Sequence, residues 1–341
     1  MVTVQHPAHV HFFRPVIEAL RADGHAVRVC ARDKDLTVPL LEAHGVEHTA
    51  LAGSSESTVG RALVQARYEL GVLRAARRFD PDVIVAISGV AASHVAPLVG
   101  ARSVVLSDSE ADGVEQRLAF PFAHFVVTPE WYDGDLGYKH VTYRGLHELA
   151  YLDPRRFEPD PAVVREAGVD PESTYSVVRF VSWGAQHDVG EGGFSPADRR
   201  RLVERLAAHG DVYVTSEDEL GADLEPYRLP VEPEAIHHLL AFADLYVGDS
   251  QTMATEAALV GTPAVRSNSF AAGDDMANFR RLEEQDLVFS TGDPEAALAR
   301  AEELLASDGG DDWARKRDTF LEDAVDVTDF VADLLVEVGR P

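Results

Sequence analysis

Short apolar runs alternate with longer segments of helical periodicity along most of this chain. In the first half, strands are expected at 2–4, 26–30, 82–87, 103–106, 125–128 and 140–143. Helices are expected over 11–22, 38–44 and 59–78, and over a segment that ends near 98. This alternation, with nearly continuous apolar strands, predicts a parallel sheet that carries helices on both faces.

The pattern breaks between 151 and 174, where Asp-Pro and Glu-Pro pairs interrupt any regular period, and it then starts again. Further strands are expected at 175–180, 211–215 and 245–247, with helices over 196–208 and 234–242. The fold class predicted is therefore α/β, with two doubly wound Rossmann-like domains over 1–152 and 153–322. The last segment, 323–341, contains a helix that is expected to pack back on the first domain.

The stretch from Gly248 to Val265 joins a strand end, a polar turn, a helix and the start of another strand. The backbone amides and positive dipole end of this helix would point beyond the strand, where a diphosphate fits. The turn residues concerned are Asp249, Ser250, Gln251 and Thr252. Glu256, one turn into the helix, is placed to accept hydrogen bonds from two ribose or sugar hydroxyls. The alternative is an ordinary capped helix with Glu256 on its solvated face.

The composition of the chain narrows the kinds of molecule that it can be expected to bind. The 341 residues, 45% of them hydrophobic, can bury substantial cores. With 58 acidic and 31 basic residues the formal net charge is -27, which argues against nucleic acid and anionic membranes as partners. No stretch approaches the roughly 20 apolar residues that span a bilayer, so we expect a cytoplasmic protein with no transmembrane segment. The single cysteine, Cys30, lies in an apolar run and is expected to be a buried structural thiol.

Nearly all the positive charge is arginine, because Lys34, Lys139 and Lys316 are the only lysines. A carboxylate excess with so little lysine resembles the proteins of halophilic archaea, whose hydrated acidic surfaces stay soluble at high salt. The acidity then reflects habitat and says little about function.

Ligands of parallel α/β sheets bind beyond the carboxyl ends of the strands, so the residues that follow each strand are candidates for a site. After the first strand come His6, His9 and His11, with Arg14 one turn further along. No carboxylate joins these histidines, so we expect no metal site. His9 or His11 is a candidate general base or phosphate donor, and the alternative is a histidine that caps the turn.

Two further turns of the first domain are polar. Ser88 and Gly89 follow one strand and could supply backbone donors to a bound anion. Asp108 and Glu110 follow the next and are candidates for hydroxyl binding or acid/base work. A cluster that simply caps the next helix is the alternative.

In the second domain Arg179 lies inside an apolar strand, where a guanidinium demands an anionic partner. That partner is either a structural carboxylate or a ligand phosphate. Trp183 and His187, just after this strand, are candidates for a base or sugar site, although Trp183 could equally belong to the core. Asn278, after a loop near 270–276, is expected to close over the ligand.

Several familiar signatures do not occur in the sequence. There is no GxGxxG after the first strand, which disfavours a dinucleotide oxidoreductase, and there is no GxxxxGK[ST] phosphate loop. A GxSxG nucleophile turn and a zinc metalloprotease helix do not occur either. What is left is a two-domain α/β protein whose second domain has a helix suited to a phosphate.

Four motifs of the chain resemble a mainly archaeal family, the domain of unknown function 354. They are HPAHVHFF from His6, ARDKD from Ala31, VRFVSW from Val178 and GDSQTM from Gly248. That family looks like the GT-B superfamily of glycosyltransferases and non-hydrolysing UDP-N-acetylglucosamine 2-epimerases. The resemblance implies two Rossmann-like domains whose parallel sheets face a cleft, with a nucleotide sugar bound mainly by the second and an acceptor by the first.

The resemblance to the epimerases extends to single residues. Asp249, Ser250 and Glu256 match their phosphate helix, and Glu256 falls where their ribose-binding glutamate lies. Gln251 and Thr252 stand where the epimerases have two glycines. Glu110 resembles one of their catalytic carboxylates and His187 their second-domain histidine. Their catalytic Asp after the third strand is missing, because Ser88 and Gly89 occupy that turn.

The first hypothesis is therefore a GT-B glycosyltransferase that takes a sugar from a nucleotide donor, expected to be UDP-linked, without a metal or other cofactor. His9 or His11 would take the acceptor proton, and the turn amides with Arg179 would stabilise the leaving diphosphate. A nucleotide-sugar epimerase and a non-catalytic nucleotide- or sugar-binding protein are the alternatives. The sequence is also compatible with a homodimer.

Overall fold

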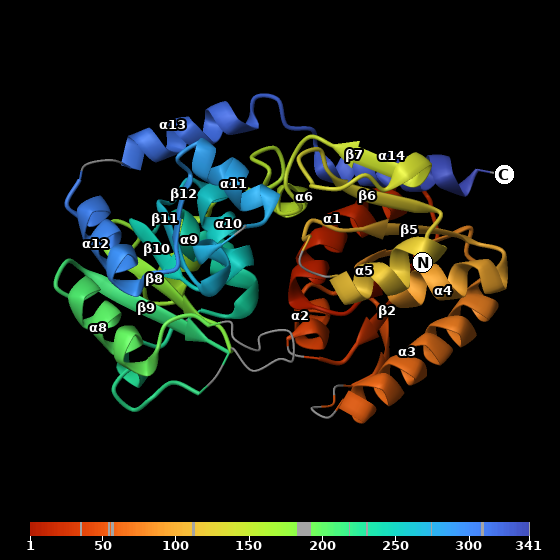
Figure 1. The fold of residues 1–341 in the computed structure, drawn as a ribbon, viewed down its shortest axis with the longest axis horizontal. Coiled ribbons are helices and arrows are strands. Elements are labelled where there is room, and N and C mark those ends of the chain that lie inside the picture. The colour runs from red at the N-terminus through yellow and green to blue at the C-terminus, as the bar shows by residue number, and fades with distance from the viewer. Residues whose placement is uncertain are drawn as a thin grey trace. The chain divides into compact units, whose positions relative to one another are not determined.

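Two separate parallel sheets organise the chain in its computed structural model, which describes residues 1–34, 36–53, 55, 58–110, 113–182, 192–217, 219–229, 231–273, 275–307 and 310–340 (Figure 1). The chain divides into two compact units. Unit 1 comprises Met1–Asp153 and Ala324–Pro341, and unit 2 comprises Pro154–Asp323. The predicted α/β class with two parallel sheets is confirmed.

The sheet of unit 1 has seven strands in the order β3-β2-β1-β4-β5-β6-β7, all paired in parallel. Its strands are β1 (Val2–Val4), β2 (Val29–Arg32), β3 (His48–Ala52), β4 (Val83–Ile87), β5 (Arg102–Leu106), β6 (Phe125–Pro129) and β7 (His140–Tyr143). The central strands are almost entirely buried, as their continuous apolar runs predict.

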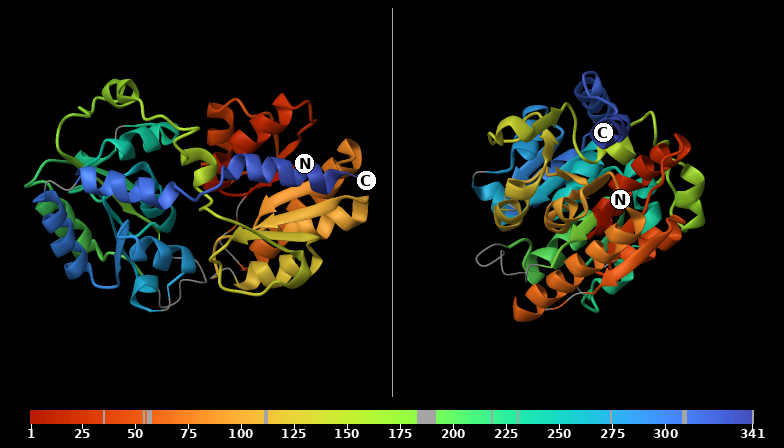
Figure 2. Two further views of the ribbon diagram at one scale, coloured as in Figure 1. Left: turned by 90° about the horizontal axis from the view of Figure 1, so that it is seen from above. Right: turned by 90° about the vertical axis from the view of Figure 1, so that its right-hand side faces the viewer.

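Helices cover both faces of this sheet. They are α1 (Pro7–Ala22), α2 (Thr37–Ala43), α3 (Thr58–Phe79), α4 (Val90–Val99), α5 (Gly113–Ala119), α6 (Leu149–Leu152) and α14 (Val327–Gly339). One core on the α3 and α4 side contains Cys30, Tyr68 and Val95. The last helix, α14, packs against α1 and belongs to unit 1, where Figure 2 shows it in blue beside the red elements.

The sheet of unit 2 has five parallel strands in the order β12-β11-β10-β8-β9. Its strands are β8 (Tyr175–Phe180), β9 (Asp211–Ser216), β10 (Leu245–Gly248), β11 (Ala264–Ser267) and β12 (Val288–Thr291). The helices are α7 (Pro161–Glu166), α8 (Pro196–Leu206), α9 (Ile236–Ala241), α10 (Gln251–Val260), α11 (Ala277–Glu284), α12 (Pro294–Leu305) and α13 (Gly310–Leu321). A core beneath α8 and α12 contains Val178, Leu202 and Leu298.

Strand order reverses at one point in each sheet. In unit 1 the chain runs outward from β1 on one side and from β4 on the other, and in unit 2 the same happens between β8 and β10. In open parallel sheets the loops after such strands diverge, and ligands bind at the carboxyl ends of the strands at that point. The residues after β1, β4, β8 and β10 are therefore placed to meet a ligand within their own unit.

The structure corrects two kinds of local expectation. Helix α1 begins at Pro7 and not at His11, so His9 and His11 both lie on the helix. Strands β3 and β12 were not expected, and both lie at sheet edges where half-exposed residues replace an apolar run. None of the described helices is long and apolar enough to cross a membrane.

Candidate functional site

The carboxyl end of β1 leads directly into α1. The Nδ1 of His6 accepts a hydrogen bond from the amide of Ala8 at 3.2 Å, so His6 is the cap of this helix. Pro7 at the first helical position has no amide to satisfy, which suits the start of a helix. One of the three histidines is thus a structural cap.

His9, on the first turn of α1, lies beside titratable groups. Its ring centroid is 5.8 Å from that of His6, and its buried Nδ1 has no hydrogen-bond partner within the described ranges. Desolvation, with a smaller contribution from the neighbouring His6, lowers the pKa of His9 to about 3, although the charge of Asp108 acts in the opposite direction. The imidazole is therefore neutral at physiological pH.

Asp108 follows β5 and lies 3.1 Å from Nδ1 of His147, measured from its Oδ2. Burial by itself would raise the pKa of Asp108, but the charge of His147 and a hydrogen bond with it outweigh that effect and hold the pKa below its usual range. His147 is only 6% exposed and stacks edge-on against Phe12. Asp108 keeps about a third of its side chain exposed, so part of this carboxylate is open to solvent.

His11 points elsewhere. Residues two positions apart on a helix are separated by roughly 200° around its axis, so His9 and His11 cannot share a face. The ring of His11 lies 5.4 Å from Tyr151 and 5.9 Å from His44. Arg14 has its Nε buried without a partner in the described part of the chain. Asp108 and His147 are among the charged groups that act on His9.

The turn after β4 is occupied by backbone interactions. The amide of Ser88 donates to the carbonyl of Leu106 at 3.0 Å, so it is not open to an anion. A Cβ on Gly89 would lie 2.9 Å from Cγ2 of Val105 and 3.1 Å from Cβ of Ala86, so close packing explains this glycine.

Glu110 lies on the loop after β5, and its two carboxylate oxygens have different surroundings. Its Oε1 accepts a hydrogen bond from the amide of Asp133 at 3.0 Å, which ties this loop to the segment after β6. Its Oε2 is buried and, among the residues that the structure covers, meets no partner. Glu110 therefore has one structural oxygen and one that is unsatisfied.

In unit 2, the end of β10 comes unusually close to its neighbours. A Cβ on Gly248 would overlap the hydroxyl of Tyr246 and lie 2.6 Å from the carbonyl oxygen of Arg179. Only glycine fits there. Asp249 and Ser250 follow it, and the Oγ of Ser250 accepts a hydrogen bond from the amide of Met253 at 3.3 Å. Ser250 is therefore the cap of α10.

Asp249 is 1% exposed and organises the carboxyl end of this sheet. Its Oδ1 accepts a hydrogen bond from the amide of Val181 at 2.7 Å, which holds the loop after β8. Its carbonyl accepts one from Nδ2 of Asn268 at 3.1 Å, which holds the loop after β11. The first residues of α10, Gln251 and Thr252, are partly exposed beside this framework.

Glu256 lies on the buried side of α10, not on a solvated face. It is 5% exposed, and its Oε1 is 2.9 Å from Nε2 of His237 on α9. The alternative of a glutamate on a solvated face is therefore wrong, and the carboxylate has a protein partner.

Arg179 meets a structural carboxylate. Its Nη1 donates to Oγ1 of Thr215 at 2.8 Å and its Nη2 to Oε1 of Glu217 at 2.9 Å. The other carboxylate oxygen of Glu217 accepts from the amide of Ser182 at 3.1 Å. Of the two partners considered for Arg179, the protein itself supplies one, and three of its five N–H donors remain for other groups.

The other candidates of unit 2 divide into two groups. Asn278, on α11, is 6% exposed, and its Oδ1 accepts from the amide of Phe279 at 2.9 Å, so it is buried in this conformation. Trp183 and His187 lie outside the described residues. Over the ranges that are described, no group of three His, Cys, Asp or Glu is arranged to hold a metal ion.

Three residues of these sites are not singled out by the sequence patterns: His147, His237 and Asn268. His147 and Asn268 follow β7 and β11, so the rule that selects residues after strands would include them. His237 lies within α9, and nothing local distinguishes it from a surface histidine.

A family model described as "Protein of unknown function (DUF354)" matches residues 1–338. No curated protein matches the sequence.

Among solved structures, the spinosyn forosaminyltransferase SpnP is similar at 15% identity, with 99% of each chain covered and a TM-score of 0.66. The spinosyn rhamnosyltransferase SpnG complexed with thymidine diphosphate follows at 16% identity, 99% of each chain and a TM-score of 0.62. A putative UDP-N-acetylglucosamine 2-epimerase from Listeria monocytogenes matches at 12% identity, over 98% of this chain and 94% of its own, with a TM-score of 0.65. These likenesses show a GT-B-like fold.

Proposed function

The chain belongs to the DUF354 family, and from that premise we propose that it is a GT-B-type glycosyltransferase that moves a sugar from a nucleotide-sugar donor to an acceptor without a metal. One observation carries the proposal. At the carboxyl edge of unit 1, a neutral His9 stands within electrostatic range of the partly exposed carboxylate of Asp108. A neutral imidazole can accept a proton from a hydroxyl, and a neighbouring carboxylate favours the imidazolium that forms.

In the proposed reaction the acceptor hydroxyl gives its proton to His9 as its oxygen forms a bond to the anomeric carbon of the sugar. The bond from that carbon to the nucleoside diphosphate breaks, and the diphosphate leaves with the electron pair. Asp108 stays ionised because its pKa is held low, so it can stabilise the imidazolium that forms.

Stabilisation of the leaving diphosphate is assigned to unit 2. The amides of the first turn of α10 and the positive end of its dipole favour an anion there. Gly248 and Asp249 keep that turn in place. The charge of Arg179 is already compensated by Glu217, so Arg179 contributes hydrogen bonds more than net charge. Glu256, paired with His237, is proposed to receive the ribose hydroxyls.

The fold neighbours support this choice. SpnG is recorded in complexes with thymidine diphosphate and with the spinosyn aglycone, a nucleotide and a small acceptor. We extend this to a nucleoside diphosphate here, with a UDP-linked donor as the first candidate.

The first experiment measures calorimetric binding of UDP and of thymidine diphosphate to the purified chain, in dilute buffer and in molar salt. Molar salt is included because an acidic chain of this kind resembles the proteins of halophiles. Asp249→Ala should weaken nucleotide binding by about tenfold or more, because the loop framework loses its buried anchor. Asp223→Ala, an exposed carboxylate paired with Arg200, is the matched control and should bind normally.

His9→Ala should keep nucleotide affinity and lower the rate of sugar transfer by roughly 10³-fold. A chain that binds neither nucleotide, or a His9→Ala variant that transfers at the full rate, would contradict the proposal.

An epimerase is the second candidate, favoured by the buried oxygen of Glu110 that has no partner among the described residues. Epimerisation needs additional acid/base groups, and such a carboxylate could supply one. Incubation with UDP-N-acetylglucosamine and no acceptor separates the two activities. Conversion without an acceptor would assign the epimerase, and nucleotide binding without turnover on any acceptor would assign a binding protein.

A further inference from the structure

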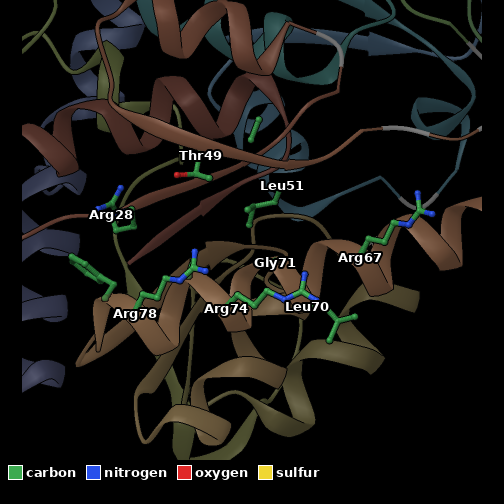
Figure 3. Close-up of a pocket in the computed structure, with 11 residues that line it drawn as sticks. Arg28, Thr49, Leu51, Arg67, Leu70, Gly71, Arg74 and Arg78 are labelled. Atoms are coloured by element: carbon green, nitrogen blue, oxygen red, sulfur yellow. The ribbon is translucent and has the colours of Figure 1, made fainter.

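An open groove of about 700 Å³ runs along α3 in unit 1, between that helix and β2 and β3 at the edge of the sheet (Figure 3). None of the residues that line it belongs to the cluster around His9 and Asp108. The groove is therefore a second feature of unit 1, separate from the proposed catalytic edge.

Arginine dominates this groove. Arg28 enters it from the strand side, and Arg67, Arg74 and Arg78 project into it from α3, as Figure 3 shows. No acidic residue is found among the described residues that line it. The whole chain has 58 acidic residues against 31 basic ones, so a carboxylate-free row of arginines is contrary to its overall charge. Such a row concentrates positive potential in a concave surface.

Structural roles account for part of the row. Arg28 lies 3.9 Å from Glu47 in an exposed ion pair. Arg78 lies in the last turn of α3, where a cation favours the helix dipole. Arg67 and Arg74 make no ion pair with any described residue, and Arg74 and Arg78 stand four residues apart, where like charges destabilise a helix. An anion bound from outside would remove this repulsion.

The spacing of the arginines indicates an extended anion. Residues 67, 74 and 78 share one side of α3, and a rise of about 1.5 Å per residue makes the row roughly 16 Å long. A single phosphate or carboxylate could engage only one end of it. Partly exposed apolar side chains, Leu51 and Phe79, lie beside the arginines and offer contact surface that a purely inorganic polyanion would not use.

We propose that this groove binds an extended acidic glycan. Its carboxylates pair with Arg67, Arg74 and Arg78, for which planar guanidinium groups are well suited. The C–H faces of its sugar rings cover Leu51 and Phe79. Binding of an anion follows from the groove itself, whereas the choice of a glycan rests on the proposed function.

The test uses tetragalacturonic acid, an oligosaccharide with one carboxylate per sugar, in calorimetry with the full chain. The double variant Arg67→Gln/Arg74→Gln should weaken its binding by about tenfold or more. Arg61→Gln/Arg77→Gln removes the same charge from the same helix outside the groove and should leave the affinity within about twofold. Thermal unfolding of both doubles checks that they fold equally well.

Three further probes test the class of ligand. Maltotetraose, which is neutral, should not bind, whereas octaglutamate and inorganic polyphosphate should bind at least about tenfold more weakly than tetragalacturonic acid. Equal loss of affinity in both double variants, or equally tight binding of any of these three probes, overturns the proposal. Nucleotide binding is measured in the same variants and should be unchanged, so failure of the groove is distinguished from failure of the transferase assignment.

Discussion

The two units carry their polar residues at the same place, the carboxyl edge where strand order reverses, but they differ in how their polar groups are satisfied. In unit 1, the buried Nδ1 of His9 meets no partner among the described residues, and Asp108, although it pairs with His147, is partly exposed. In unit 2, charged side chains are paired within the protein, as in Arg179 with Glu217 and in the fully buried Arg266 with Asp275.

In the proposed function, this difference separates two chemical tasks. A group proposed to move protons needs a perturbed pKa, and the pKa values of His9 and Asp108 are both shifted. A surface that is to hold an anion needs a rigid backbone whose side chains do not compete for its amides, which buried Asp249 and the internal pairs favour. The contrast can be tested by substitutions that affect one unit and leave the other intact.

The largest effect is expected at two glycines, Gly89 after β4 and Gly248 at the end of β10. Gly248→Ala should lower the free energy of unfolding by about 3 kcal/mol, because the new Cβ meets the backbone oxygen of Arg179. Gly89→Ala should cost about 1 kcal/mol, because its nearest neighbours are side chains that can move. Urea denaturation measures both, with Gly113→Ala as the control whose Cβ meets nothing. Equal costs at the two sites would show that the edges are equally rigid.

A smaller effect is expected from the pH dependence of unit 1. The pKa of His9 is about 3 in the folded chain, whereas a histidine in an unfolded chain titrates near 6.5. Below about pH 6.5 the unfolded chain binds a proton that the folded chain does not. The contribution of His9 to the free energy of unfolding is therefore complete above that pH and is lost as the pH falls toward 3. Because His9 is partly exposed, we expect a loss of roughly 2 kcal/mol, less than the full shift implies.

His9→Gln should remove this part of the pH dependence between pH 6.5 and 4. His25→Gln, at an exposed position of the same unit, should retain it. Denaturation midpoints at a series of pH values make the measurement, and an unchanged slope in His9→Gln would mean that the imidazole is hydrated in the folded state.

The smallest effect is expected at the half-exposed pair of unit 2. Glu217→Gln should change the free energy of unfolding by less than about 1 kcal/mol, since the amide can still accept from Ser182. It should also strengthen UDP binding several-fold, because the charge of Arg179 is no longer compensated. Glu302→Gln, which breaks an exposed pair with Arg205, is the control and should leave UDP binding unchanged. A weaker affinity in Glu217→Gln would show that Glu217 positions Arg179 more than it neutralises it.

Much of the fold could be predicted from local pattern. Buried strands such as β8 are continuous apolar runs, and α10 stops at Gly261 in a left-handed conformation, where the sequence places a glycine. Edge strands such as β3 could not, because half-exposed residues carry no apolar period. The residues that follow strands are candidates on local pattern alone, whereas His237 is not, since its partner Glu256 lies on a different helix.

The sequence by itself determined the α/β class, the parallel sheets and the polar turns at their carboxyl ends, because apolar runs and helical periodicity are local properties of the chain. Only the tertiary structure decided which polar residues meet. It brought His9 within electrostatic range of Asp108 and placed His11 beside Tyr151, and it gave Arg179 a carboxylate from the residue that follows the neighbouring strand. The physical reason is that contacts, burial and pKa depend on residues far apart in the chain, and no local period records them.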